Sequence, residues 1–171
     1  DLLDAVAFRF PVAVIGELVG VPEADRDQFR TLVRTSTAMI EASPDLAALE
    51  AAEAAMGTMS SYFADLVAER TTTPRDDLIS AMVQVDDDGD RLSTEEIIST
   101  AILLFAAGFE TTTNLIGNGL HALITHRSQL QRLLNEPHLI NSAVEELLRF
   151  ESPIQLNNRL TKIGRASCRE R

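Results

Sequence analysis

The 171-residue sequence has little cysteine and few basic residues, and each shortage excludes a class of protein. Its one cysteine, Cys168, has no partner for an internal disulfide, which excludes a disulfide-stabilised scaffold and fits a reducing compartment. Lysine and arginine number 15 against 26 aspartates and glutamates, so the formal net charge is −11. A chain this acidic is a poor partner for nucleic acid, and we expect none.

The sequence also lacks an apolar run long enough to cross a membrane. Its most apolar stretch, residues 97–107, is about half of what a spanning helix needs and continues into Glu110 and Asn114. No signal-peptide pattern opens the chain. We therefore expect a cytoplasmic protein that does not associate with a membrane.

Apolar side chains recur at helical spacing along the chain and predict a mainly α-helical fold. We expect helices over residues 11–18, 22–40, 45–70, 76–85, 93–126 and 141–150. Pro22 and the acidic residues behind it favour a helix N-terminus at that point. The expected core positions of the first three helices are Val12, Ile15, Val19, Phe29, Leu32, Val33, Met39, Leu46, Leu49, Ala52, Met56, Met59, Tyr62, Phe63, Leu66 and Val67.

The helix expected over residues 93–126 places an ionisable side chain in a long apolar segment. Ser93 and Glu96 have the spacing of a capping box at its start. The apolar residues that follow are Ile97, Ile98, Ala101, Ile102, Leu103, Leu104, Phe105 and Ala106, which predicts a helix buried nearly all round. A carboxylate at Glu110 would cost several kcal/mol if it were buried without partners. We therefore expect Glu110 to be hydrogen-bonded or to lie beside a wet cavity.

Small residues precede Glu110 by less than one turn of the same helix. Ala107 and Gly108 expose almost no side chain, so a flat or bulky group can lie against the helix backbone there. Thr111 is placed to donate a hydrogen bond to the carbonyl of Ala107, which would widen or kink the helix. A simpler interpretation is that Ala107, Gly108, Gly117 and Gly119 only let another helix approach closely.

A second motif lies in the helix expected over residues 141–150, where Glu146 and Arg149 are three residues apart. Most such pairs are surface ion pairs. Here Ser152-Pro153 ends the helix, an extended segment follows over residues 154–156, and Arg159 comes next. The order and spacing of these features together are a more specific sequence signature than any one of them alone.

Taken together, the two motifs resemble those of the cytochrome P450 superfamily, in its soluble bacterial form. The family's central helix carries Ala/Gly-Gly-x-Asp/Glu-Thr, matched here by Ala107, Gly108, Glu110 and Thr111. A later family helix carries Glu-x-x-Arg, and the following strand carries an arginine that holds a haem propionate; Glu146, Arg149 and Arg159 match these positions. The resemblance covers residues 1–161. It implies an all-α fold with a long central helix and a short β segment near the C-terminus.

The resemblance also implies roles for individual residues. Haem b would lie against Ala107, Gly108 and Thr111, with one propionate held by Arg159. Glu110 and Thr111 would be catalytic, relaying the protons that dioxygen activation requires. Glu146 and Arg149 would be structural, and the residues that could face the substrate are Leu103, Ala106, Ile154 and Gln155.

The resemblance further implies the reaction and its participants. The activity would be a monooxygenase reaction, in which one atom of dioxygen is inserted into an apolar small molecule. Electrons would come from NAD(P)H through a ferredoxin or a flavodoxin-type donor. The alternative is a non-catalytic helical ligand-binding or interaction domain, in which Glu110 and Thr111 merely line an apolar cavity.

The sequence departs from the family pattern at its C-terminal end. The family holds the haem iron through a cysteine thiolate in Phe-x-x-Gly-x-x-x-Cys-x-Gly. Cys168 lacks these surroundings and comes too soon after Arg149, so we expect no metal ligand here. Residues 163–171 resemble a translated sequencing adapter, and we exclude them from the fold. We expect residues 1–162 to be the middle portion of one P450 domain, truncated at both ends, and the fragment alone to be inactive.

Overall fold

The computed structural model describes residues 3–40, 45–85, 89 and 91–155. Seven α-helices run through this part of the chain: α1 (Arg9–Val19), α2 (Arg26–Ser36), α3 (Leu46–Thr72), α4 (Leu78–Gln84), α5 (Thr94–Thr125), α6 (Arg127–Asn135) and α7 (Ile140–Phe150). Shorter turns of π- or 3-10 helix join them: η1 (Leu3–Phe8), η2 (Glu23–Asp25), η3 (Thr37–Ile40) and η4 (Pro137–Leu139). The mainly α-helical fold class is confirmed.

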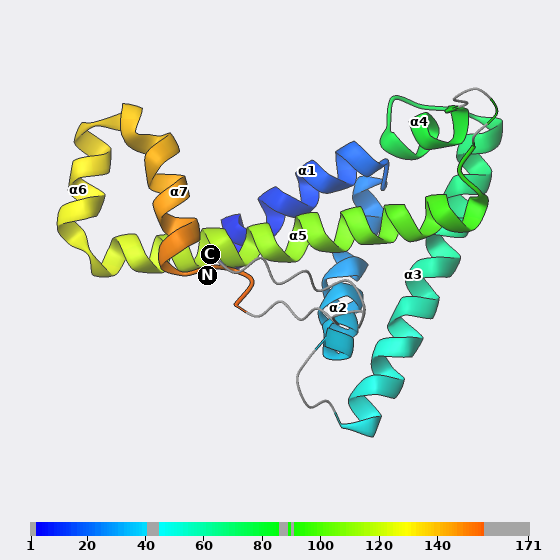
Figure 1. Cartoon of the computed structure of the whole chain (residues 1–171), viewed down its shortest axis with the longest axis horizontal. Helices are drawn as coiled ribbons and strands as arrows, with labels where there is room; N and C mark the ends of the chain where they lie inside the picture. The colour runs from blue at the N-terminus through cyan, green and yellow to red at the C-terminus, as the bar shows by residue number, and fades with distance from the viewer. Residues whose placement is uncertain (1–2, 41–44, 86–88, 90, 156–171) are drawn as a thin grey trace, which may run out of the picture.

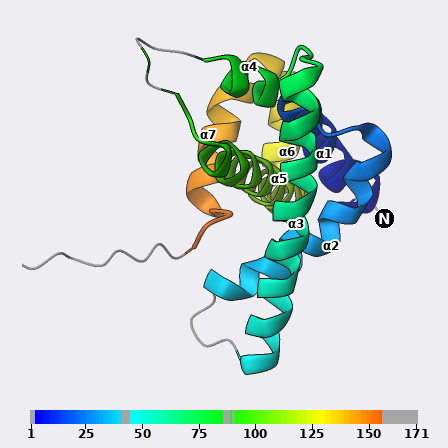
Figure 2. The same ribbon diagram turned by 90° about the vertical axis from the view of Figure 1, so that its right-hand side faces the viewer.

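Helix α5 forms the axis of the molecule (Figure 1). Helix α1 lies along it, α2 and α3 cross it near its N-terminal half, and α6 and α7 form a hairpin at its C-terminal end. In a view along α5, α1 and α3 lie on one side of it and α7 lies on the other (Figure 2). Two separate faces of α5 are therefore in contact with other helices.

Local capping explains where three of the helices begin. Asp45 accepts a hydrogen bond of 2.7 Å from the Ala48 amide at the start of α3. Asp77 accepts one of 2.8 Å from the Ser80 amide at the start of α4. The capping box at α5 is formed as expected: the Glu96 amide donates to Ser93 Oγ at 3.2 Å, and the Ser93 amide donates to Glu96 Oε2 at 2.8 Å.

The core lies where α1, α2, α3 and α5 meet. An aromatic cluster occupies its centre, with the ring of Phe29 at 4.6 Å from that of Phe105, 5.0 Å from Tyr62 and 5.6 Å from Phe63. The buried residues around it include most of those expected from the sequence: Val12, Ile15, Val19, Val33, Ala52, Met59, Leu66 and Val67. The helical spacing of apolar residues was thus enough to predict these core positions.

Three expected core residues are exposed instead. Met39 is 51% exposed, Leu46 72% and Leu49 37%. Leu46 and Leu49 occupy the first turn of α3, which extends beyond the other helices (Figure 1). Apolar spacing marks one face of a helix, but it does not tell how far along the helix that face has a partner.

Further details also differ from the expectations. Helix α5 is not buried all round, because Leu103 is 66% and Leu104 37% exposed. Helix α6 was not predicted. The expected short β segment is not formed at Ile154 and Gln155, since the described part of the chain offers no strand with which they could pair. The remainder of that segment lies outside the described residues.

A buried ion pair joins three chain segments beside the core. Arg70, at the end of α3, is 1% exposed, and its Nε donates a hydrogen bond of 2.6 Å to Asp77 Oδ2. The Arg70 Nη2 donates to the Gly20 carbonyl at 3.0 Å. Its Nη1 lies 2.8 Å from Glu69 Oε1, but no hydrogen bond forms there. Removing one partner of such a pair leaves a buried charge without compensation.

Candidate functional site

One face of α5 is open to solvent and carries several of the residues singled out from the sequence. Leu103 and Ala107 are exposed and Thr111 is half-buried, and their spacing of four places them on one side of the helix. The Thr111 hydroxyl donates to the Ala107 carbonyl at 2.7 Å, as expected. This face therefore offers an apolar surface that ends in one hydroxyl group.

Gly108 faces a neighbouring helix rather than this open surface. A Cβ at Gly108 would lie 2.9 Å from Ile15 Cδ1 of α1. The same holds for two further glycines of α5. A Cβ at Gly117 would lie 2.9 Å from Leu3 Cδ2, and a Cβ at Gly119 would lie 2.9 Å from Leu147 Cδ1. The absence of a side chain at these positions lets other elements pack closely on α5, as the simpler interpretation of the sequence proposed.

Glu110 lines a groove of about 530 Å³ together with Arg34 of α2. It is half-buried, and its carboxyl has no hydrogen-bond partner among the described residues; no hydrogen bond joins it to the Thr111 hydroxyl. Burial raises the pKa of the Glu110 carboxyl, and the Arg34 guanidinium offsets part of this rise. Of the two arrangements expected for Glu110, a hydrogen bond or a place beside a wet cavity, the structure shows a cavity and no hydrogen bond. Arg34 was not identified from the sequence.

The expected substrate-facing residues do not all lie together. Ala106 is half-buried and packs against the core of the protein. Ile154 is 58% exposed, and Gln155 is exposed with its Nε2 3.5 Å from Glu151 Oε1. Of the four candidates, only Leu103 stands on the open face of α5 with Ala107 and Thr111. Arg159, Cys168 and residues 163–171 lie outside the described residues.

Glu146 and Arg149 form a two-point ion pair on the surface of α7. Arg149 Nε and Nη2 donate to the two carboxylate oxygens at 2.7 and 2.6 Å. These bonds hold the pKa of Glu146 below its usual range and that of Arg149 above it. Both side chains are more than half exposed, so the pair is screened by solvent.

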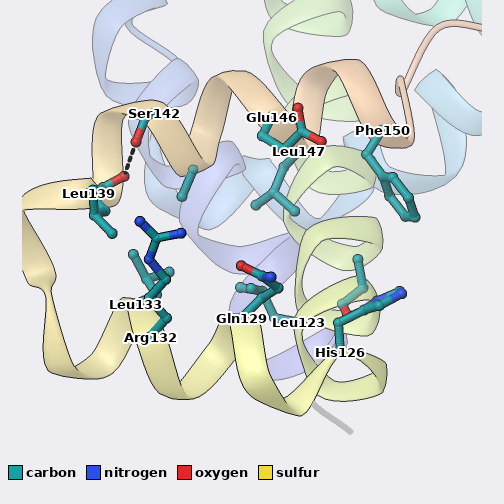
Figure 3. Close-up of a pocket in the computed structure, with 12 residues that line it drawn as sticks. Leu123, His126, Gln129, Arg132, Leu133, Leu139, Ser142, Glu146, Leu147 and Phe150 are labelled. Atoms are coloured by element: carbon teal, nitrogen blue, oxygen red, sulfur yellow. Dashed lines mark hydrogen bonds between the residues drawn. The ribbon is translucent and has the colours of Figure 1, made fainter.

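A second pocket, of about 430 Å³, lies between the C-terminal end of α5 and helices α6 and α7 (Figure 3). Leu123, Leu133, Leu139 and Leu147 supply much of its apolar lining, and Glu146 stands at its edge. The rings of His126 and Phe150 meet edge to face at 5.7 Å beside it. This pocket was not anticipated, because α6, which forms one of its walls, was not predicted.

The described residues contain no group of three or more side chains that could hold a metal ion. No helix among them is both long and apolar enough to cross a bilayer.

Comparison with known proteins supplies a family for this arrangement. The family model described as Cytochrome P450 matches residues 32–162. The Vitamin D(3) 25-hydroxylase of Pseudonocardia autotrophica is 48% identical over 155 residues, which are 90% of this chain and 37% of that protein. The Cytochrome P450 monooxygenase PikC of Streptomyces venezuelae is 42% identical over 91% of this chain and 36% of its own length.

Solved structures give the same result for the fold. P450BioI, in complex with hexadec-9Z-enoic acid ligated Acyl Carrier Protein, superposes with a TM-score of 0.85 and 37% identity. The match covers 90% of this chain and 39% of that one. The chain thus spans a little over a third of the length of the relatives that it matches.

Proposed function

Because the chain belongs to the cytochrome P450 family, we propose that residues 1–162 form the middle portion of a haem-thiolate monooxygenase domain. The observation that carries the proposal is the open apolar face of α5, where Leu103 and Ala107 precede the Thr111 hydroxyl. The proposed reaction inserts one atom of dioxygen into an apolar small molecule. The chain alone, without a cysteine thiolate to hold the iron, is expected to be inactive.

The residues present fit one face of a haem. Ala107 leaves the backbone of α5 uncovered, Leu103 extends the apolar surface by one turn, and Gly108 keeps α1 close behind the helix. In the proposed enzyme Arg159 would hold a propionate. Haem b, when bound, supplies the oxidation chemistry itself, while the protein provides orientation and protons.

Thr111 and Glu110, which are consecutive residues of α5, are both proposed to handle protons. The Thr111 hydroxyl donates its hydrogen bond to the Ala107 carbonyl, so its oxygen can accept a hydrogen bond from a water on the open face. The raised pKa of Glu110 brings its carboxyl closer to the range in which it can both take up and release protons. Ordered water would have to join the two groups, because no direct hydrogen bond does.

The remaining roles are also proposals. Glu146 and Arg149 would be structural, and Leu103, Ala106, Ile154 and Gln155 would contribute to the substrate site. An apolar substrate is consistent with the name of the vitamin D(3) hydroxylase relative. Electrons would come from NAD(P)H through a ferredoxin or flavodoxin-type partner, in the cytoplasm.

A chimeric enzyme tests the proposal. Residues 1–162 replace the matching segment of the Pseudonocardia autotrophica hydroxylase, which is 48% identical to this chain. We expect the chimera to take up haem, seen by absorbance, and to consume NAD(P)H with substrate present. With Thr111→Ala, the NAD(P)H consumed should yield hydrogen peroxide in place of oxidised product. Glu110→Gln should slow turnover about 100-fold.

Thr113→Ala is the matched control. Thr113 also donates to the carbonyl four residues back, that of Phe109 at 2.8 Å, but it lines the groove rather than the open face. The control should therefore keep the ratio of product to peroxide. The proposal is refuted if the chimera binds haem and Thr111→Ala behaves like Thr113→Ala.

A further inference from the structure

The groove beside Glu110 has the construction of a small-molecule site in its own right. It lies between η1, α2 and α5, and its volume of about 530 Å³ is within the range of pockets that hold small ligands. Its lining does not include Ala107 or Thr111. It does include Glu110, so a ligand bound there would lie beside one of the two residues proposed to handle protons.

The floor of the groove is aromatic. Phe8 of η1 and Phe109 of α5 meet edge to face at 5.1 Å, and they are 7% and 5% exposed. The parts of the two rings that line the groove can contact an apolar group of a ligand.

Two arginines, one turn apart on α2, reach this groove, and they differ in their partners. Arg30 donates to Asp4 Oδ1 at 2.6 Å and stacks over the Phe8 ring at 4.3 Å, so its charge is already compensated. Arg34 lines the same groove, and its guanidinium makes no ion pair or hydrogen bond with any residue that the structure describes. An available guanidinium beside an apolar floor favours a ligand with a carboxylate, which it can bind at two points.

Amide groups of α5 extend the polar side of the groove. Asn114 and Asn118 follow Glu110 at intervals of four residues and line the groove with it. Neither amide is hydrogen-bonded to another side chain in the described part of the chain, so both can donate to a ligand oxygen. Glu110 is the one carboxylate in the lining that the structure describes, and when ionised it competes with a ligand for Arg34.

We propose that this groove binds a small amphipathic carboxylate, with the carboxylate group on Arg34 and the apolar part on Phe8 and Phe109. Asn118 and Asn114 hold the second carboxylate oxygen. A ligand there contacts α2 and α5 together and stabilises their packing.

The test uses the complete 171-residue chain and 4-phenylbutyrate as the probe. Titration followed by ¹H–¹⁵N NMR should give saturable shifts at the amides of Arg34 and Asn118, and the probe should raise the melting temperature. The uncharged analogue 4-phenylbutanol should bind about tenfold more weakly or worse, because it cannot form the charge-assisted bonds. Absence of saturable shifts in the groove, or equal binding of the alcohol, overturns the proposal.

Two substitutions should act in opposite directions. Arg34→Gln removes the guanidinium and should weaken 4-phenylbutyrate binding about tenfold or more. Glu110→Gln removes the competing carboxylate and should tighten binding several-fold. Far-UV circular dichroism checks that each variant keeps the helical content of the parent chain.

Arg127→Gln is the matched control, because Arg127 is exposed at the start of α6 and lies outside the groove. It should leave binding unchanged. If it weakens binding as much as Arg34→Gln, the probe responds only to the overall charge of the chain and the site does not exist.

Discussion

At the scale of single residues, Gly20 is a position where the backbone conformation requires glycine. It ends α1 with φ of 101°, a conformation that residues with a side chain rarely adopt. A Cβ there would also lie 2.5 Å from Cγ of Asp77, which caps α4 and pairs with Arg70. Glycine is thus required both by the turn and by the buried ion pair beside it.

Gly20→Ala should lower the free energy of unfolding by about 2 kcal/mol or more, through strain at positive φ and displacement of Asp77. Urea denaturation measures this change. Gly57→Ala is the control, because Gly57 lies inside α3 and a Cβ added to it would meet no atom within 4 Å. It should instead stabilise the helix by about 0.5–1 kcal/mol. Equal effects of the two substitutions would contradict this account.

The Arg70–Asp77 pair makes the stability depend on pH. Burial alone would raise the pKa of Asp77, but hydrogen bonds from Arg70 and from the Ser80 amide and hydroxyl hold it below the ordinary value of 3.8. A carboxyl whose pKa is lower when folded stabilises the protein above its unfolded pKa, and this contribution is lost as the pH falls through the folded value. Asp77 therefore contributes fully near neutral pH.

Asp77→Asn should accordingly destabilise the chain near pH 6, and the deficit relative to the parent should shrink below about pH 3.8. Urea denaturation of both proteins between about pH 6 and about pH 2.5 measures the difference. A deficit that stays constant over this range would mean that the ionisation of Asp77 makes no contribution.

Contacts between neighbours in the sequence could be predicted at this scale, and contacts between distant segments could not. The capping residues Asp45 and Ser93 could be predicted, because their partners lie three residues away. The burial of Arg70 could not, since its partners at Gly20 and Asp77 come from other segments and an arginine at a helix end is ordinarily exposed.

At the scale of elements, α5 is held to α1 by a contact at Gly108. Ile15 Cδ1 and Cγ1 lie 2.9 and 3.1 Å from the position of a Cβ there, while Ile15 Cβ is 3.6 Å away. Gly108→Ala should therefore destabilise the chain by about 1 kcal/mol, because the clash exceeds the gain in helix propensity.

A double-mutant cycle isolates this contact. Ile15→Ala removes the two close atoms, so Gly108→Ala made in that background should become stabilising by about 1 kcal/mol. The four proteins are compared by urea denaturation. Additive effects would show that Gly108 and Ile15 are not in contact.

The same helix shows why the candidate site was only partly predictable. The capping box, the Thr111–Ala107 bond and the position of Glu110 beside a cavity follow from spacing along one helix. What each face of α5 contacts depends on α1, α2 and α7, which pack on it from other parts of the chain. The approach of Arg34 to the groove beside Glu110 is therefore a result of tertiary structure.

At the scale of the whole molecule, the described chain leaves several apolar faces uncovered. On the outer side of η1 and α1, Val6, Phe10, Val14 and Leu18 are each 45% exposed or more and recur every four residues. Contiguous apolar surface of this kind is uncommon on a monomer. It is consistent with our proposal that this chain is one portion of a larger domain.

These faces should bind the dye 1-anilinonaphthalene-8-sulfonate. We expect the parent chain to enhance the fluorescence of the dye. Phe10→Gln/Val14→Gln should reduce this enhancement by about half, because it interrupts the apolar stripe formed by the four exposed residues of η1 and α1. Leu134→Gln is the control, since Leu134 is 64% exposed on α6, away from η1 and α1. It should reduce the fluorescence less than the double substitution does. Equal reduction by both variants would contradict the role of the stripe.

The enclosure of Arg70 also has a consequence for proteolysis. Trypsin cleaves after exposed arginines, and most arginines in the described part of the chain are exposed, whereas Arg70 is 1% exposed with its guanidinium fixed to Asp77 and Gly20. Cleavage after Arg70 requires that the end of α3 separate from α1 and α4. The time at which that peptide bond is cut, relative to the others, therefore reports how often these three helices come apart.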